Sequence, residues 1–239
     1  MTRSRSQASP ARDAKRTSTK PPAPRSRRVS HAEAARKLAT QDPVIARLLG
    51  EVGLPRLHRP QNSHFAALVQ AIVYQQLAGP AARAIHGRLT ATLNGDVQPH
   101  ALIALHDETL RAVGLSANKV ASLRDLATKV LDDTVVLSPR RLSRQSDDEV
   151  VARLSAVRGI GRWTAEMFLM FQLRRLDVWP TGDLGVRRGY GLAWGIPMPT
   201  APELGPLGDP YRPYRSVVAW YCWRAAEVRS RTSESALTR

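Results

Sequence analysis

The segment Leu154-Ser-Ala-Val-Arg-Gly-Ile-Gly-Arg-Trp-Thr-Ala165 decides the fold expected for this chain. Apolar residues at helical spacing precede its Gly-Ile-Gly, and a second helix is expected to begin directly afterwards. Gly159 and Gly161 flank one aliphatic residue, which allows a tight turn with positive φ. Ile160 would anchor that turn in the core. The segment therefore predicts two helices joined by a short hairpin.

This hairpin has two interpretations. Backbone amides at the start of its second helix, together with the helix dipole, would form a phosphate site. Arg162 and Thr164 could add side-chain contacts to phosphates. The alternative is an ordinary turn between helices with a glycine cap. The Arg-Trp-Thr-Ala that follows favours DNA binding, through contacts that hold the backbone without reading base sequence.

Most of the remaining chain is patterned as helices, and we predict an all-α domain. Serines and a proline stand at helix starts, and apolar residues recur at spacings of three and four. The expected helices cover residues 63–79, 80–93, 116–130, 146–157, 164–174 and 213–226. Residues 135–137 and 176–179 are candidate strands, but neither has a partner at hairpin spacing.

The composition narrows the partners and the compartment. The 239 residues carry a formal net charge of +16, which favours a polyanion: nucleic acid first, an anionic membrane surface second. Cys222 is the single cysteine, so an internal disulfide and a four-cysteine iron–sulfur cluster are excluded. The six histidines show no metal-ligand spacing. No apolar run approaches the ~20 residues of a membrane span. We expect an intracellular, cytoplasmic protein without a metal site or membrane contact.

Residues 1–30 differ from the rest because they hold nine Lys or Arg and a single acid. Such a segment cannot bury a core, and we interpret it as a disordered basic arm for DNA, with a transit peptide as the alternative. The predicted division is a disordered tail over residues 1–35, a helical domain over 36–228 and a disordered tail over 229–239.

Asp183 is the candidate catalytic residue. Pro180 and Gly182 force a bend before it, and Asp183 stands at the expected N-cap of the next helix. Aspartate is a favoured N-cap, so a purely structural role is the alternative. The functional interpretation is that a carboxylate ionised at a helix start, close to a phosphate-binding hairpin, could stabilise a positively charged sugar or activate water. The nearby Asp177 is interpreted as structural.

Together these motifs resemble the helix-hairpin-helix/Gly-Pro-Asp superfamily of DNA glycosylases. Three further stretches resemble one branch, the DNA-3-methyladenine glycosylase II enzymes. They are Ala71-Ile-Val-Tyr-Gln-Gln-Leu-Ala-Gly79, Val113-Gly-Leu-Ser-Ala-Asn-Lys119, and Tyr211-Arg-Pro-Tyr-Arg-Ser216 leading to Trp220-Tyr-Cys-Trp-Arg224. The resemblance covers residues 40–228 and implies a compact two-lobed helical fold, with the hairpin and Asp183 at the cleft between lobes.

The resemblance also implies roles for individual residues. Bifunctional relatives place a lysine where this chain has Trp163, so the implied enzyme is monofunctional and leaves an intact abasic site. Trp163 and Trp223 would line the pocket for a flipped base, with Tyr74 and Trp220 as weaker candidates. Gln76 and Leu77 would form the wedge that enters DNA. Met167 stands where some relatives have an aromatic pocket residue.

The implied partner is double-stranded DNA that contains damaged bases, bound by a monomer in the nucleoid. No cofactor is implied beyond a monovalent cation at the hairpin carbonyls. Two alternatives stay open: a noncatalytic DNA-binding module built on the same hairpin, and a glycosylase of this fold that acts on uracil, thymine mismatches or oxidised purines. A membrane-surface protein is disfavoured because the charge lacks an amphipathic basic helix.

Overall fold

A computed structural model describes residues 29–237, which form thirteen α-helices, one π-helical turn, one 3-10 turn and no strand. The elements are α1 (His31–Gln41), α2 (Pro43–Val52), α3 (His64–Tyr74), α4 (Gly79–Thr92), α5 (Pro99–Ala104), α6 (Asp107–Ala112), α7 (Ala117–Leu131), α8 (Pro139–Leu142), α9 (Asp147–Ser155), α10 (Arg162–Met167), η1 (Phe168–Gln172), α11 (Leu184–Trp194), α12 (Ala201–Leu207), η2 (Asp209–Tyr211) and α13 (Arg215–Leu237). The predicted all-α class is confirmed.

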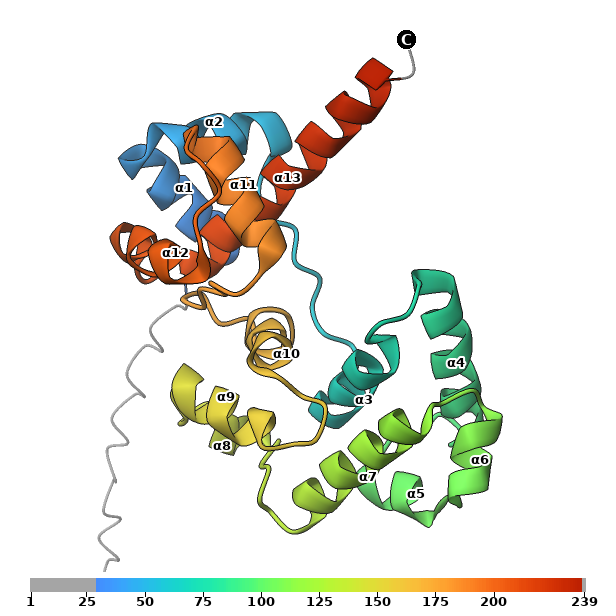
Figure 1. The fold of residues 1–239 in the computed structure, drawn as a ribbon. Coiled ribbons are helices and arrows are strands. Elements are labelled where there is room, and N and C mark those ends of the chain that lie inside the picture. Colours follow the sequence, from blue (N-terminus) through green and yellow to red (C-terminus); the bar gives the residue numbers. More distant parts are fainter. Residues whose placement is uncertain (1–28, 238–239) are drawn as a thin grey trace, which may run out of the picture.

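The helices form two lobes (Figure 1). The first lobe combines α1 and α2 with α11, α12 and α13, while the second holds the helices from α3 to α9. The chain crosses between them in an extended linker after α2 and returns after η1. The continuous helix of α10 and η1 lies between the lobes and contacts both α9 and α3.

Capping side chains fix several helix starts where the sequence predicts them. Ser63 accepts a hydrogen bond from the Ala66 amide, and Ser116 does the same for Lys119. Ser146 forms a capping box with Glu149 at the start of α9. Each cap satisfies an amide that has no partner inside its helix, so each sets the residue at which the helix begins.

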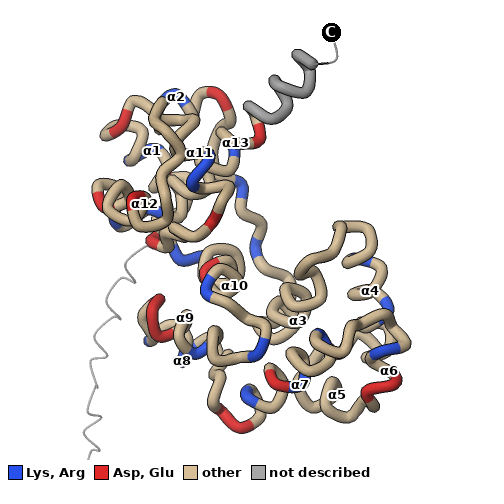
Figure 2. Tube along the Cα trace, in the orientation of Figure 1, with Lys and Arg blue, Asp and Glu red and all other residues tan. Residues whose placement is uncertain are grey.

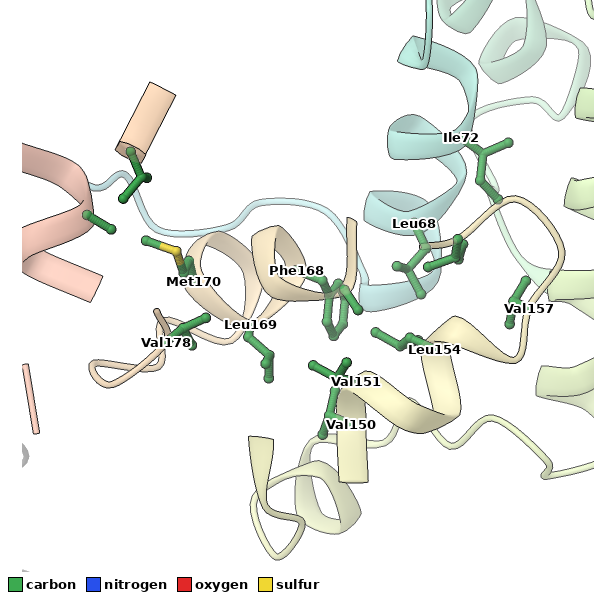
Figure 3. Packing of buried hydrophobic residues seen from close by; sticks show 14 of the residues in the cluster. Leu68, Ile72, Val150, Val151, Leu154, Val157, Phe168, Leu169, Met170 and Val178 are labelled. Atoms are coloured by element: carbon green, nitrogen blue, oxygen red, sulfur yellow. The ribbon is translucent and has the colours of Figure 1, made fainter. Parts of the chain in front are cut away.

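One apolar core runs from α3 through α9 to η1. Leu68 and Ile72 on α3 are fully buried, and Leu154 on α9 and Phe168 on η1 are nearly so. Figure 3 shows Leu68, Phe168 and Leu154 close to one another, with Ile72 further along α3. This packing holds the start of α10 against the second lobe, which places the hairpin beside α3.

The structure corrects several sequence predictions. Both candidate strands, 135–137 and 176–179, are irregular segments. The helix expected over 63–79 ends at Tyr74, and Gly79 instead begins α4. The break between them covers residues 75–78 and includes Gln76, which has a φ of +56°.

The described helices extend beyond the predicted domain boundaries at both ends. Ser30 caps α1 through a capping box with Glu33, so helix begins at His31, inside the tail predicted over 1–35. α13 continues to Leu237, beyond the predicted end of the domain at residue 228. Most of the predicted basic arm, residues 1–28, lies outside the described residues. Within the described part, no helix combines the length and apolarity needed to cross a bilayer.

Candidate active site

The hairpin requires its first glycine. Gly159 has a φ of +78°, and a Cβ there would lie 2.6 Å from Ser122 Oγ. Gly161 has a φ of −89°, so the expectation of positive φ holds for one glycine of the pair. Ile160 is 3% exposed and packs in the core, as predicted. The turn is therefore fixed both by backbone conformation and by lack of space.

Side chains from the residue after α3 and from α7 hold the hairpin in place. Gln75 donates a hydrogen bond from Nε2 to the Gly159 carbonyl oxygen at 2.8 Å. Asp125 accepts one from the Arg158 amide at 2.7 Å and binds Lys129 Nζ at 2.6 Å. Sequence reasoning missed both residues, because the contacts join segments far apart in the chain.

The start of α10 is open to an anion. Gly161 is its N-cap and supplies no side-chain cap, so first-turn amides lack an intrahelical partner. Arg162 is exposed, and its Nε donates to Glu166 Oε1 at 2.8 Å. Burial raises the pKa of Glu166. Thr164 is buried and lines a pocket, so its side chain does not face solvent for the predicted phosphate contact.

Asp183 is the N-cap of α11 and is held from three directions. Its Oδ1 accepts hydrogen bonds from the Val186 amide at 2.8 Å and from Trp223 Nε1 at 2.9 Å. Its Oδ2 accepts one from Trp163 Nε1 at 2.6 Å. The side chain is 8% exposed and is linked to the helix that follows the hairpin. A capping carboxylate and two indole donors thus form one rigid group.

Two glycines on α11 allow this arrangement. A Cβ on Gly185 would lie 2.8 Å from Trp223 Cδ1, and one on Gly189 would lie 1.8 Å from the Cys222 carbonyl oxygen. Their spacing of four puts both on the helix face that packs against α13. That spacing was available in the sequence as a signal of close helix packing. The thiol of Cys222 is fully buried, and burial, with the charge of Asp183, raises its pKa.

An apolar pocket of about 710 Å³ adjoins this group; we call it the central pocket. Its lining includes Leu68, Ala71, Tyr74, Gln75, Gln76, Gly159, Gly161, Trp163, Thr164, Met167, Phe168 and Phe171. Asp183 does not line it directly. Trp163, which is 51% exposed, connects Asp183 to the central pocket. Its ring lines the pocket, and its Nε1 donates a hydrogen bond to the carboxylate.

Comparison with known proteins identifies the family. Residues 69–204 match the family described as HhH-GPD superfamily base excision DNA repair protein, over more than half of the chain. The chain belongs to this superfamily.

Within the HhH-GPD superfamily, several of the proteins that it resembles are named DNA-3-methyladenine glycosylase. DNA-3-methyladenine glycosylase 1 of Schizosaccharomyces pombe is 33% identical over 187 residues, which cover 76% of this chain and 82% of the relative. A crystal structure of DNA-3-methyladenine glycosidase from Bacillus halodurans superposes with a TM-score of 0.74 at 34% identity, covering 81% of this chain and 88% of the other. The S. pombe enzyme Mag1 in complex with abasic DNA gives a TM-score of 0.69 at 33% identity, covering 80% and 95%. The predicted family and enzyme class are confirmed.

The aromatic residues of this HhH-GPD protein separate into different roles. Trp163 and Tyr74, two of the residues predicted for the base pocket, line the central pocket. The ring of Trp223 stacks on that of Phe171, with the ring centroids 5.8 Å apart. Its Nε1 donates a hydrogen bond to Asp183. Trp220 lines a different hollow, so the structure does not bring it to the central pocket.

Phe171 is the pocket residue that sequence reasoning missed. It lies in the π-helical turn η1 and is 42% exposed. A π turn adds a residue to the helical repeat and frequently marks a functional site. Met167, the position compared with an aromatic of relatives, also lines the pocket, one turn before Phe171. Helical periodicity alone could not find Phe171, because it assumes the regular repeat.

The predicted wedge residues lie in the loop between α3 and α4. Gln76 and Leu77 are both exposed, and Gln76 also lines the central pocket. The positive φ of Gln76 is uncommon for a residue with a side chain. The loop is therefore held in a special conformation at the edge of the pocket. Within the described residues, no group of His, Cys, Asp or Glu side chains could hold a metal ion.

Proposed function

We propose that this DNA glycosylase removes alkylated bases of the 3-methyladenine type, with Asp183 as its catalytic carboxylate. The observation that carries the proposal is the Asp183 group: a fixed anion, bound through Trp163 to an apolar pocket and to the hairpin helix. The relatives named DNA-3-methyladenine glycosylases support the choice of lesion.

The reaction follows from this arrangement. A damaged nucleotide leaves the duplex, at a cost that is lowest where pairing is already weak, and its base enters the central pocket. An alkylated purine is cationic and gains about 0.5–2 kcal/mol over an indole face. When the bond between C1′ and the base nitrogen breaks, its electron pair leaves with the base. The sugar becomes positively charged and is stabilised by Asp183. Water then bonds to C1′, and its proton passes to the carboxylate.

The product is an intact abasic site. An imine mechanism needs an amine at the reacting carbon, and no lysine lines the central pocket. Trp163 instead stands in the first turn of α10 and donates its N–H to Asp183. The proposal is therefore a monofunctional enzyme that needs no cofactor.

DNA would be held on both sides of the flipped nucleotide. The open amides of α10 and the guanidinium of Arg162 would bind phosphates, aided by a monovalent cation at the hairpin carbonyls. Gln76 and Leu77 would fill the space that the base leaves. We further propose that the enzyme acts as a monomer on damaged double-stranded DNA in the nucleoid.

The test is Asp183→Asn, because asparagine keeps the helix cap and removes the charge. We expect base release from methylated duplex DNA to fall at least about 100-fold, with binding to the same DNA retained. Asp209→Asn is the matched control, since this exposed aspartate loses the same charge outside the site. Free bases would be identified by chromatography.

Three results would contradict the proposal. Near-normal release by Asp183→Asn would remove the catalytic assignment. No release by the wild type from any damaged DNA would favour the noncatalytic binding module. Release of uracil or oxidised purines in place of alkylated bases would favour the other lesion specificity.

A further inference from the structure

A second hollow, of about 630 Å³, lies between the interlobe linker and α13; we call it the linker hollow. Its lining residues are Val52, Gly53, Leu54, Arg56, Leu57, His58, Phe171, Trp220 and Arg224. The linker passes along it without secondary structure from residue 53 to residue 63. The base-release mechanism uses neither Trp220 nor Arg224, so the hollow has no role in the function proposed above.

The linker beside the hollow is cationic, and one of its arginines, Arg56, lines the hollow. Arg56 and Arg59 on the linker are exposed and have no hydrogen-bond or ion-pair partner among residues 29–237. In Figure 2 the linker between α2 and α3 carries Lys and Arg colouring where it crosses between the lobes. Unpaired guanidinium groups on an extended segment are available for an anion, because no carboxylate competes for them.

Arg224 faces the same hollow from α13. Its guanidinium lies 5.5 Å from the centroid of the Trp220 ring and binds Glu227 at 2.6 Å. The Trp220 ring and Phe171 add flat apolar surface to the lining. The hollow thus combines fixed and unpaired cations with aromatic walls, and this combination suits a nucleotide, which carries an anionic phosphate beside an apolar sugar and base.

The linker hollow adjoins the central pocket. Phe171 lines both spaces, and its ring stacks on Trp223, the indole that binds Asp183. A single aromatic side chain therefore belongs to the wall of each. A DNA strand whose flipped nucleotide occupies the central pocket would bring a neighbouring nucleotide close to the linker.

We propose that the linker hollow is a second nucleotide subsite, which binds a nucleotide flanking the flipped one. The subsite deepens the proposed function and rests on it. Arg56 and Arg224 bind the flanking phosphate, and Trp220 contacts the sugar or base. The hairpin and the hollow then hold the DNA from the two lobes, one on each side of the reacting sugar.

Arg56→Gln tests the phosphate contact. Binding would be measured on a duplex that contains a stable abasic-site analogue, over about a tenfold range of salt. Loss of one phosphate contact lowers the slope of log K against log salt by about 1. The matched control is Arg111→Gln, an exposed arginine on α6 at the far end of the second lobe, which should leave the slope unchanged.

Truncated duplexes locate the subsite. When the duplex lacks the flank that reaches the linker, the salt slope of the wild type should equal that of Arg56→Gln. When the duplex lacks the other flank, the two proteins should still differ in slope. Trp220→Leu should weaken binding roughly tenfold without changing the slope, because it removes an apolar contact. Thermal unfolding of each variant would confirm that it is folded.

Equal slopes for Arg56→Gln and Arg111→Gln would overturn the subsite, as would a difference that survives both truncations. The base-release assay of the wild-type protein separates this result from the proposed function, because that assay does not involve the Arg56 substitution. A slope change in a protein that releases no base would keep the subsite and refute the enzyme. Normal base release with no change in the salt slope would keep the enzyme and refute the subsite.

Discussion

Gly185→Ala tests whether the position of Trp223 controls the catalytic carboxylate. The added Cβ would lie 2.8 Å from Trp223 Cδ1 and 3.1 Å from Asp183 Oδ1, where ordinary contacts begin at 3.4 Å. The indole must therefore move by about half an ångström. That movement strains and weakens the hydrogen bond of 2.9 Å between Trp223 Nε1 and Asp183 Oδ1.

Two opposing effects set the change in stability. A hydrogen bond to a charged group contributes about 1.5–3 kcal/mol, and replacing glycine by alanine in a helix returns up to about 1 kcal/mol. We expect the free energy of unfolding to fall by about 1–2 kcal/mol. Activity should fall further, because displacing a catalytic group by about 1 Å can cost about 100-fold in rate.

The assay is single-turnover base release, with thermal unfolding measured in parallel. Gly87→Ala is the matched control, because this exposed helical glycine on α4 has no atom within 4 Å of the added Cβ. It should keep full activity and equal or greater stability. If Gly185→Ala released bases as fast as Gly87→Ala, the contact between Trp223 and Asp183 would have no positioning role.

Two further predictions concern the hairpin and a buried histidine. Gly159→Ala should lower the free energy of unfolding by about 1–3 kcal/mol, because the residue has a φ of +78° and its Cβ would lie 2.6 Å from Ser122 Oγ. The same substitution should weaken binding to lesion-containing DNA. Unchanged affinity would argue against the hairpin as a DNA contact. His31 is 6% exposed, and burial, with the charge of Arg174, lowers its pKa to about 4. Between pH 6.5 and 4 the unfolded chain therefore binds a proton that the folded chain does not. The free energy of unfolding consequently decreases as the pH is lowered through that window. We expect a loss of about 2 kcal/mol from pH 7 to pH 5 in chemical denaturation, and His31→Leu should reduce this loss; an equal loss in the variant would exclude His31 as its source.

The sequence predicted the parts of the site that local chemistry determines. Gly159 and Ile160 form a turn that few other residues could form, and Asp183 caps a helix as its neighbours required. Both features depend on contacts within a few residues along the chain. The group around Asp183 was harder to predict, because Trp223 reaches Asp183 only through the close packing of α11 against α13.

The failures have physical causes as well. Phe171 lies in a π turn, and periodicity counted at the regular repeat does not assign its side chain to the pocket. Residues 135–137 and 176–179 have the composition of strands but no strand to pair with. The helix from Ser63 was expected to continue to Gly79, yet Gln76 adopts a left-handed conformation that only the surrounding structure can hold.

The first lobe joins segments that are made at different times. α1 and α2 pack against α13, and almost the whole second lobe separates them along the chain. On the ribosome, the second lobe has all its helices before α11 has been synthesised. Leu38, Ile45 and Leu48 are buried in the folded protein, but they stay exposed to solvent until α11 and α13 have been synthesised. The nascent chain thus carries a completed lobe beside an exposed apolar surface, and this stage is where chaperone binding or aggregation would act.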